Sequence, residues 1–425
     1  MREMKNSGVE WIGEIPAEWK IVKVKQAFFR KNEKAQQENP VVLSLARLGV
    51  KVRDITANEG QIAESYYNYN PVSIGDLLLN PMDLYSGANC SISKVEGVIS
   101  PAYANLRSKE GYFSNFYDYY FKVQYWMMVL FAHGKGVSFD NRWTLTNETL
   151  MNFPVVAPSL TEQHRIADFL DKKCAKIDVV IEKQKQVIEK LKEYKLSVIT
   201  EAVTKGLDRT VPMKDSGVEC VGSIPNHWKV IKFKHICESI GDGLHGTPEY
   251  DLDGEYYFLN GNNIGNEKLV FKDNTDRLNE EEYKKYKPVN INENTILITL
   301  NGATYGKTSF YNNEKVLLGK SAGYITLKDS ENKYFVRIYL QSHIAKLFME
   351  LSLCGSTIAN LSLKTLNEFI MPYPPCDEQE EIVEYISSKC FELDCAIDKK
   401  QAIIDKLTEY KKSLIYEVVT GKREV

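Results

Sequence analysis

The sequence predicts a mixed α/β (α+β) protein in which two globular domains are separated by two long antiparallel coiled-coil helices, with pseudo-two-fold symmetry. Three observations predict this fold. A short segment, SGVEWIGEIPAEWK from Ser7, returns as SGVECVGSIPNHWK from Ser216. A long segment from Glu162 to Thr204 returns from Glu378 to Thr420, whereas the stretches between the repeats are unlike in sequence. The chain therefore consists of repeated segments that enclose two stretches of unrelated sequence.

The repeats divide the 425 residues into six parts, and both variable stretches have the size of a single domain. We expect an N-terminal segment at 1–19, a first globular domain at 20–158, a central helix at 159–206, a repeat of the N-terminal segment at 207–228, a second globular domain at 229–375 and a C-terminal helix at 376–425.

The long repeat has the apolar periodicity of an amphipathic helix. Apolar residues recur at steps of mostly three or four from Ile166 to Ala202 and again from Ile382 to Val418, and we place Tyr194 and Tyr410 in this inner stripe. The stripe lasts about six heptads, which is typical of a coiled coil. A helix of this length with one apolar stripe needs a partner.

Start and stop signals agree with this period. Thr161 and Asp377 are the expected N-caps, and Gly206 and Gly421 lie where each helix should end. The nearest partner for each helix is its other copy. Because one globular domain precedes the first helix and the other lies between the helices, the pair must run antiparallel.

The two variable stretches share a plan. Each is expected to contain a buried strand, at Ile74–Asn80 and Asn294–Asn301, followed by a glycine loop. An aromatic helical segment comes next, at Phe113–Phe131 and Tyr334–Leu353, and a proline-rich exit leads into the long helix. The sequence therefore predicts two domains of one kind.

Composition excludes several classes of protein. No run of 18 or more apolar residues occurs and the N-terminus lacks the layout of a secretory signal, so we expect a cytoplasmic protein without membrane contact. Eight cysteines and six histidines show no metal-binding spacing, so no metal site is predicted. The net charge of −3 gives no global sign of nucleic-acid binding. Residues 20–158 nevertheless carry fifteen basic against twelve acidic side chains, which favours the variable domains as any DNA-facing surface.

Three motifs resemble catalytic ones but lack essential parts. NGATYGKTS from Asn301 resembles a phosphate-binding loop, but its first glycine is one position out and no helix is expected after it. NPMD from Asn80 resembles a methyltransferase tetrapeptide, but it lacks the aromatic residue that clamps a flipped base, and no cofactor loop accompanies it. His245 stands alone in GDGLHGTPEY. We therefore predict no catalytic residue and no cofactor.

The loops suit binding instead. Cationic side chains can neutralise phosphates or pair with guanine, and amides can pair with adenine edges. The candidate DNA-binding residues are Arg30, Lys31, Arg47, Lys51, Arg53, Tyr85 and Arg142 in the first domain, and His245, Asn260, Asn262, Asn263, Thr304, Tyr305, Lys307, Lys320 and Lys364 in the second.

Charged residues of the long repeat also recur, at positions outside the apolar stripe that would pair the two helices. The matched pairs are Lys183 with Lys399, Lys190 with Lys406, and Glu193 with Glu409. Their recurrence predicts a second surface that binds another protein twice.

With these repeats in place, the chain resembles the specificity subunits of type I restriction-modification systems. The resemblance rests on the twofold SGVE…IP…W element, the proline-then-EQ exits at Ala157–Gln163 and Tyr373–Gln379, and the helices that end in ITEAVT and IYEVVT. It covers essentially the whole chain. One departure is Cys220, which stands where the first copy has Trp11.

The resemblance implies that the variable stretches are target recognition domains and that the helices are spacers. Such a subunit reads a bipartite, non-palindromic sequence in double-stranded DNA and has no catalytic activity of its own. The helices would dock two methyltransferase subunits, and restriction and translocase subunits would join through the complex. The alternative from the residues alone is a coiled-coil scaffold whose globular ends bind proteins or glycans.

Overall fold

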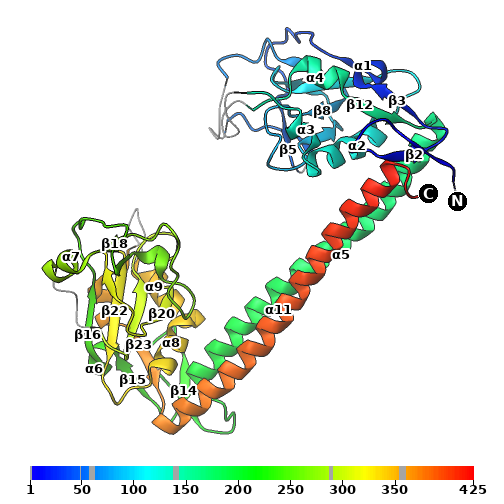
Figure 1. Cartoon of the computed structure of the whole chain (residues 1–425). Helices are drawn as coiled ribbons and strands as arrows, with labels where there is room; N and C mark the ends of the chain where they lie inside the picture. The colour runs from blue at the N-terminus through cyan, green and yellow to red at the C-terminus, as the bar shows by residue number, and fades with distance from the viewer. Residues whose placement is uncertain (1, 48, 57–62, 137–142, 287–290, 354–359) are drawn as a thin grey trace. The chain divides into compact units, whose positions relative to one another are not determined.

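The computed structural model describes residues 2–47, 49–56, 63–136, 143–286, 291–353 and 360–425, which fall into two compact units. Unit 1 contains Met1–Lys185 and Ala402–Val425, and unit 2 contains Gln186–Gln401. The two long helices, α5 (Leu160–Lys205) and α11 (Cys376–Val419), each contribute one part to each unit (Figure 1). We call the globular part of unit 1, from β3 to β12, head 1, and that of unit 2, from β15 to β23, head 2.

Head 1 is built on a four-stranded antiparallel sheet in the order β4-β11-β8-β9. Strand β8 (Leu77–Leu79) is a run of three buried leucines, as the sequence predicts for this segment. Helix α2 (Ser114–Trp126) supplies buried aromatic residues to the core on one side of this sheet. The other elements of unit 1 are β1 (Met4–Asn6), β2 (Glu14–Pro16), β3 (Lys20–Lys23), α1 (Val24–Ala27), β4 (Phe28–Arg30), β5 (Leu43–Ala46), β6 (Gly49–Val52), β7 (Asn70–Val72), β9 (Cys90–Ile92), β10 (Gly97–Ile99), β11 (Ala104–Ser108), α3 (Val129–Ala132), α4 (Asn147–Asn152) and β12 (Pro154–Ala157).

Head 2 has a four-stranded sheet of the same order, β16-β22-β19-β20, with β19 (Thr295–Thr299) buried along its whole length. A further sheet, β18-β17-β21, contains a parallel strand pair between β17 and β21, where head 1 has an isolated parallel bridge between Val42 and Val98. The other elements of unit 2 are β13 (Met213–Asp215), β14 (Ser223–Pro225), β15 (Lys229–Lys232), α6 (Phe233–Ile236), β16 (Cys237–Asp242), β17 (Tyr256–Leu259), η1 (Gly261–Asn263), β18 (Arg277–Leu278), α7 (Glu280–Lys285), β20 (Thr308–Phe310), β21 (Val316–Leu318), β22 (Ala322–Leu327), α8 (Lys333–Gln341), α9 (His343–Ser352), α10 (Leu363–Asn367) and β23 (Ile370–Tyr373).

The predicted aromatic helical segments are present but broken. The first forms α2 and α3, and the second forms α8 and α9, whose N-cap Ser342 accepts a hydrogen bond from the Ala345 amide. The two heads therefore share a sheet order and an aromatic helix, and they differ in the loops and small sheets around them.

Each repeated opening segment is tied to the first turn of a long helix by the same hydrogen bond. Trp19 Nε1 donates to Glu162 Oε2 at 2.9 Å in unit 1, and Trp228 Nε1 donates to Glu378 Oε2 at 2.9 Å in unit 2. Both indoles are fully buried. The duplicated sequence thus makes a duplicated junction between head and helix.

The sequence predicts the C-terminal ends of the two long helices correctly but not their N-terminal ends. Gly206 and Gly421 follow the helices, both with φ of +74°, as predicted. The N-cap prediction is wrong, because α5 begins at Leu160 and α11 at Cys376, so that Thr161 and Asp377 lie inside the first turn. At the first of these ends the Ser159 hydroxyl accepts a hydrogen bond from the Glu162 amide at 3.3 Å.

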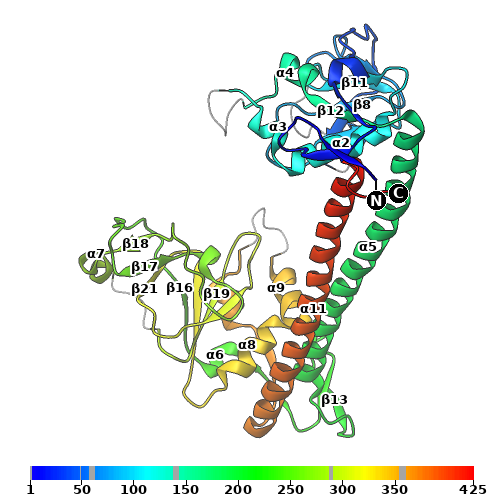
Figure 2. The same ribbon diagram turned by 45° about the vertical axis from the view of Figure 1, so that its right-hand side comes forward.

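Within each unit the two helices run in opposite directions (Figure 2). In unit 1, Lys411 of α11 pairs with Asp178 of α5 at 2.6 Å. In unit 2, Lys195 of α5 pairs with Asp394 of α11 at 2.7 Å. These are the same two repeat positions with the helices exchanged, so the helix pairing is duplicated as well.

The inner stripe was predicted correctly except at its tyrosines. Ile188, Val198 and Ile404 are buried, but Tyr194 and Tyr410 are 52% and 50% exposed and do not belong to the seam. Val187 and Ile403, seven residues earlier on each helix, are also exposed, at 37% and 39%. Each helix therefore carries a second apolar stripe, which is exposed and lies outside the seam.

Candidate nucleic-acid interface

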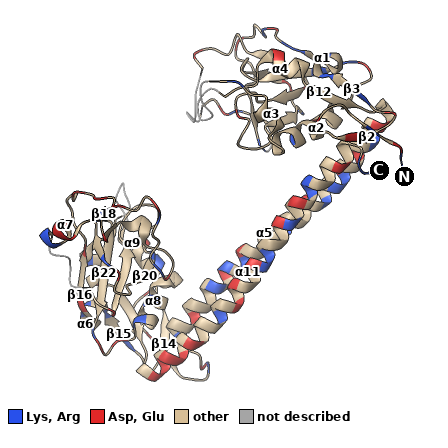
Figure 3. Cartoon of the chain, in the orientation of Figure 1, with Lys and Arg blue, Asp and Glu red and all other residues tan. Residues whose placement is uncertain are grey.

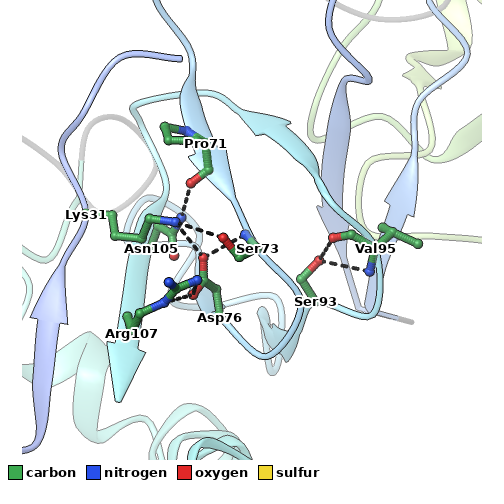
Figure 4. A network of polar contacts seen from close by, with 8 residues as sticks. All are labelled: Lys31, Pro71, Ser73, Asp76, Ser93, Val95, Asn105 and Arg107. Atoms are coloured by element: carbon green, nitrogen blue, oxygen red, sulfur yellow. Dashed lines mark hydrogen bonds and ion pairs between the residues drawn. The ribbon is translucent and has the colours of Figure 1, made fainter. Parts of the chain in front are cut away.

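Lys31, which the sequence suggested as a phosphate contact, is engaged in an internal network in head 1. Its Nζ lies 3.1 Å from the Asp76 carboxylate, whose other oxygen accepts from Arg107 at 2.8 Å. Figure 4 shows both cations converging on Asp76, with Ser73 beside it. The Asp76 side chain is 1% exposed, so it needs both partners to offset its burial. Lys31 therefore connects the end of β4 to the turn before β8.

Arg30 is also partly withdrawn from solvent. One guanidinium nitrogen donates to the Asn147 amide oxygen of α4, and burial lowers the pKa of Arg30 below its ordinary value. Its Nε has no hydrogen-bond partner among the residues that the structure describes. Arg30 thus connects β4 to α4.

The β5–β6 hairpin presents the more accessible cations of head 1. Arg47 and Lys51 are exposed, and Arg53, which follows β6, is half-buried. Tyr85 is 76% exposed, with its ring centroid 6.0 Å from that of Phe131. Arg142 lies outside the described residues. Three of these predicted contacts, at Arg47, Lys51 and Tyr85, are therefore placed where a duplex could reach them.

The loop that holds Tyr85 is stiffened by Asp83. Burial raises the pKa of this carboxyl, but hydrogen bonds from Ser86 and Asn89 outweigh the burial, so the pKa of Asp83 lies below its ordinary value. The Asn89 amide donates to Asp83 at 2.8 Å and the Ser86 backbone amide at 3.0 Å. An ordered loop presents Tyr85 without further loss of chain entropy on binding.

Two of the three candidate asparagines of head 2 shape their own loop. Asn263 accepts from the Asn260 backbone amide at 3.0 Å and donates to the Val270 carbonyl at 3.1 Å. Asn260 accepts from the Ser321 hydroxyl at 3.2 Å. Asn262, between them, is exposed. The Asn-rich turn therefore offers one free amide, on a frame made by the other two.

His245 is exposed, and its Nε2 lies 2.7 Å from Asp242 Oδ2. The pair joins the end of β16 to the loop after it. Lys320, in the turn between β21 and β22, and Lys364, in α10, are both exposed and do not adjoin His245 in any described contact.

The glycine loop of head 2 borders a groove of about 910 Å³. Tyr305 and Lys307 line it together with residues of α8 and of both long helices. Thr304 precedes them, half-buried, in the same loop. The loop's resemblance to a phosphate-binding loop ends here, because strand β20 follows it where such a loop would open a helix.

The repeated charges of the long helices are exposed in both units. Unit 1 holds Lys183, Lys406 and Glu409, and unit 2 holds the equivalent Lys399, Lys190 and Glu193. Figure 3 shows positive and negative residues distributed along both α5 and α11. The exposed apolar stripe of each helix was not predicted from the sequence. Its signal was available, because Val187 and Tyr194 are spaced by seven residues and the spacing recurs at Ile403 and Tyr410.

Within the described part of the chain, no group of three or more His, Cys, Asp or Glu side chains is placed to hold a metal ion. Among the helices in that same part, none is long and apolar enough to span a membrane.

The sequence is similar to those of known proteins. A family model for the type I restriction modification DNA specificity domain matches residues 225–409. The specificity subunit of the type I restriction enzyme MjaVIII from Methanocaldococcus jannaschii is 24% identical over 364 residues, which cover 83% of this chain and 80% of the relative. The EcoBI specificity subunit of Escherichia coli is 24% identical over 377 residues, which cover 84% and 75%.

Solved structures agree on the fold. A chain from work on complex assembly and conformational transition of the type I R-M system has a TM-score of 0.71 at 14% identity, with 96% of this chain and 99% of that chain covered. The HsdS subunit from Thermoanaerobacter tengcongensis has a TM-score of 0.50 at 16% identity, with 96% and 98% covered. Residues 225–409 thus match the DNA specificity domain of type I restriction-modification systems, and most of the chain is similar to the specificity subunits of such systems.

Proposed function

We propose that this chain reads DNA sequence for a type I restriction-modification complex. Head 1 and head 2 each read one half of a bipartite, non-palindromic target, and the paired helices set the unread gap. The observation that carries the proposal is the pairing of a duplicated frame with unlike loops. The same sheet order and the same Trp–Glu junction occur twice, while the residues around them differ. Two unlike readers on a symmetric frame suit a target with two unlike halves.

Within the heads, we assign contact with DNA to the exposed candidates. These are Arg47, Lys51, Tyr85, His245, Asn262, Lys307, Lys320 and Lys364. Lys31, Asn260 and Asn263 instead shape the surfaces that carry them, since their polar groups are used inside the heads. The domain limits proposed for the two readers are 20–158 and 229–375.

We further propose that α5 and α11 pair along their length, which gives the chain its pseudo-two-fold symmetry. The support is the ion pair that occurs in both units with the helices exchanged. Two methyltransferase subunits would dock on the helices, one on each copy of the outer apolar stripe, flanked by the repeated lysines and glutamates. Base flipping and methyl transfer would belong to these partners, and restriction and translocase subunits would join through them. The chain itself would act without catalysis, in the cytoplasm.

Selection from a random duplex library tests the reading function. The full chain is incubated with the library, with and without a methyltransferase partner, and the retained duplexes are sequenced. We expect two enriched blocks separated by a gap without preference. A library that emerges without any enriched sequence would favour a coiled-coil scaffold with protein- or glycan-binding ends.

Docking on the outer stripe has its own test. Tyr194→Asp and Tyr410→Asp should each reduce the number of bound methyltransferase subunits from two to one, measured by the mass of the complex, because each places a charge in one apolar stripe. Lys185→Gln changes the net charge by the same one unit at an exposed position on the opposite side of the helix from the stripe, and it serves as the matched control. Full occupancy in both tyrosine variants would place the docking surface elsewhere.

A further inference from the structure

The two heads carry the same three lysines on one face, at the segment that leaves the opening repeat. Lys23 and Lys25 of head 1 correspond to Lys232 and Lys234 of head 2, in the repeated pattern WKIVKVK and WKVIKFK. Lys109 joins them because its Nζ donates to the Lys25 carbonyl at 2.7 Å.

Head 2 has a similar third contact, with the acceptor one residue later in the repeat. Lys328 Nζ donates to the His235 carbonyl at 2.7 Å, and the Lys328 amide donates to Ile236, just as the Lys109 amide donates to Ala27. A basic face of three lysines is therefore built twice by similar local geometry.

The surroundings of this face differ between the heads at two positions. The first is just before β12 and β23. Val24 N donates to Phe153 O at 3.0 Å, and Phe233 N donates to Phe369 O at 2.9 Å, so the residues before these phenylalanines are equivalent. Head 1 has Asn152 there, and head 2 has Glu368.

Glu368 offsets part of the positive charge of the face of head 2. Its carboxylate pairs with Lys232 and, at 2.7 Å, with Lys234. Hydrogen bonds from Lys232 and Lys234 lower the pKa of Glu368 to about 2, so the carboxylate stays charged at any physiological pH. In head 1 the Asn152 amide carries no charge and donates to the Glu148 carbonyl at 3.0 Å.

The second difference lies beside the third lysine. In head 1 the exposed ring of Phe29 has Lys109 Nζ 4.4 Å from its centroid. The residue at the same place after α6 in head 2 is Glu238, an exposed carboxylate. Lys23, Lys25 and Lys109 make no ion pair with any carboxylate that the structure describes, whereas two carboxylates accompany their equivalents in head 2. Arg107, next to Phe29 in the sheet, is already held by Asp76 and adds no free charge.

We propose that the face formed by Lys23, Lys25 and Lys109 in head 1 binds the phosphate backbone of duplex DNA, and that Glu368 weakens such binding at the equivalent face of head 2. The inference rests on the proposed reading function and adds an asymmetry to it. Uncompensated lysines bind phosphates without regard to sequence, and each phosphate that they neutralise releases counterions. Head 1 thus supplies most of the sequence-independent affinity, and head 2 depends on its reading loops.

The salt dependence of binding tests this asymmetry. The full chain is titrated against a labelled duplex of mixed sequence over a range of KCl concentrations, and the logarithm of the binding constant is plotted against that of the salt. Lys23→Gln with Lys25→Gln should make the slope shallower by about 0.9 for each phosphate that is no longer neutralised. The matched pair, Lys232→Gln with Lys234→Gln, should change the slope by less, because the Glu368 carboxylate already offsets one of their two charges.

Exchange of the two deciding residues gives the reciprocal result. Asn152→Glu should make the slope shallower, and Glu368→Asn should make it steeper by releasing Lys232 and Lys234. Both residues lie at the surface end of a short helix, and unchanged unfolding midpoints would show that the variants fold. An equal effect of the two lysine pairs, or no effect of Asn152→Glu and Glu368→Asn, overturns the proposal.

Two further outcomes separate this inference from the proposed function. If the unmodified chain binds no duplex at any salt concentration, the reading function itself fails, and the inference falls with it. If the head 1 variants bind DNA normally but lose a methyltransferase subunit, the face contacts protein and the inference alone is wrong.

Discussion

Glu162 and Glu378 each hold a buried tryptophan at the start of a long helix, but the two carboxylates are not equally buried. The Glu162 side chain is 9% exposed and also pairs with Arg2 at 2.6 Å, whereas the Glu378 side chain is 32% exposed and pairs with His227. A hydrogen bond to a buried carboxylate is worth more than one to a solvated carboxylate, because water cannot take the place of the missing donor.

Trp19→Phe should therefore destabilise the chain more than Trp228→Phe, by about 1 kcal/mol. Both substitutions remove the same indole from a fully buried position, so the loss of packing cancels in the comparison. Urea unfolding of the full-length variants, followed by circular dichroism, measures the difference. Equal losses of stability would show that the burial of the carboxylate does not matter.

For single residues, the sequence predicts which residue types lie in the loops better than it predicts which side chains are available to contact DNA. Lys31 has the look of a phosphate contact in the sequence, but Asp76, its partner, is far along the chain. Asn260 and Asn263 are consumed by bonds to Ser321 and Val270 that only the folded loop creates. Partners that are distant in the chain decide whether these side chains are available, and a local sequence pattern does not show such partners.

At the scale of elements, the ends of α5 and α11 are both closed by a glycine in the left-handed region. The space around the two glycines differs. A Cβ on Gly421 would lie 2.3 Å from Pro16 Cδ, whereas the nearest atom to a Cβ on Gly206 is Trp228 Cζ2 at 3.2 Å. Gly421 therefore has both a backbone reason and a packing reason to be glycine.

Gly206→Ala should cost about 1 kcal/mol, the usual penalty for a side chain in this conformation. Gly421→Ala should cost clearly more, because a proline ring bonded into the backbone cannot move aside as a flexible side chain can. Thermal unfolding of both variants checks the order. If Gly206→Ala were the more damaging, the account of the packing at Gly421 would be wrong.

The long helices could be predicted because their signals are local and repeated many times. The apolar period and the closing glycines lie within the segments themselves. The N-caps were misplaced by a residue or more because several cap-forming residues adjoin each start, as Ser159 and Thr161 do at the first. Tyr194 and Tyr410 were assigned to the seam because they continue its spacing from Leu191 and Leu407, although two stripes share each helix there.

At the scale of the whole molecule, the helices are proposed to act as a ruler. Inserting one heptad beside Lys190 in α5 and another beside Lys399 in α11 would keep the phase of both stripes. The insertion lengthens the pair by about 10 Å, which corresponds to about three base pairs. The selected target should keep both half-sites and gain a gap longer by that amount. A gap of the original length would show that the helices do not set the spacing.

The duplication explains why the junctions and helices are alike in both units while the heads differ. The repeated sequence predicted the junctions and helices that recur, and the dissimilar sequence predicted that the heads would differ, but not how. The parallel pair of β17 and β21 in head 2 joins strands that are far apart in the chain, so no local sequence pattern could predict it.

The exchange of one head tests the central claim most directly. Residues 20–158 are replaced by the corresponding segment of another specificity subunit, and the target of the hybrid is determined by selection from the random duplex library. The account predicts that one half-site changes while the other half-site and the gap stay the same. A hybrid that changes both half-sites, or neither, would contradict the assignment of one reader to each half.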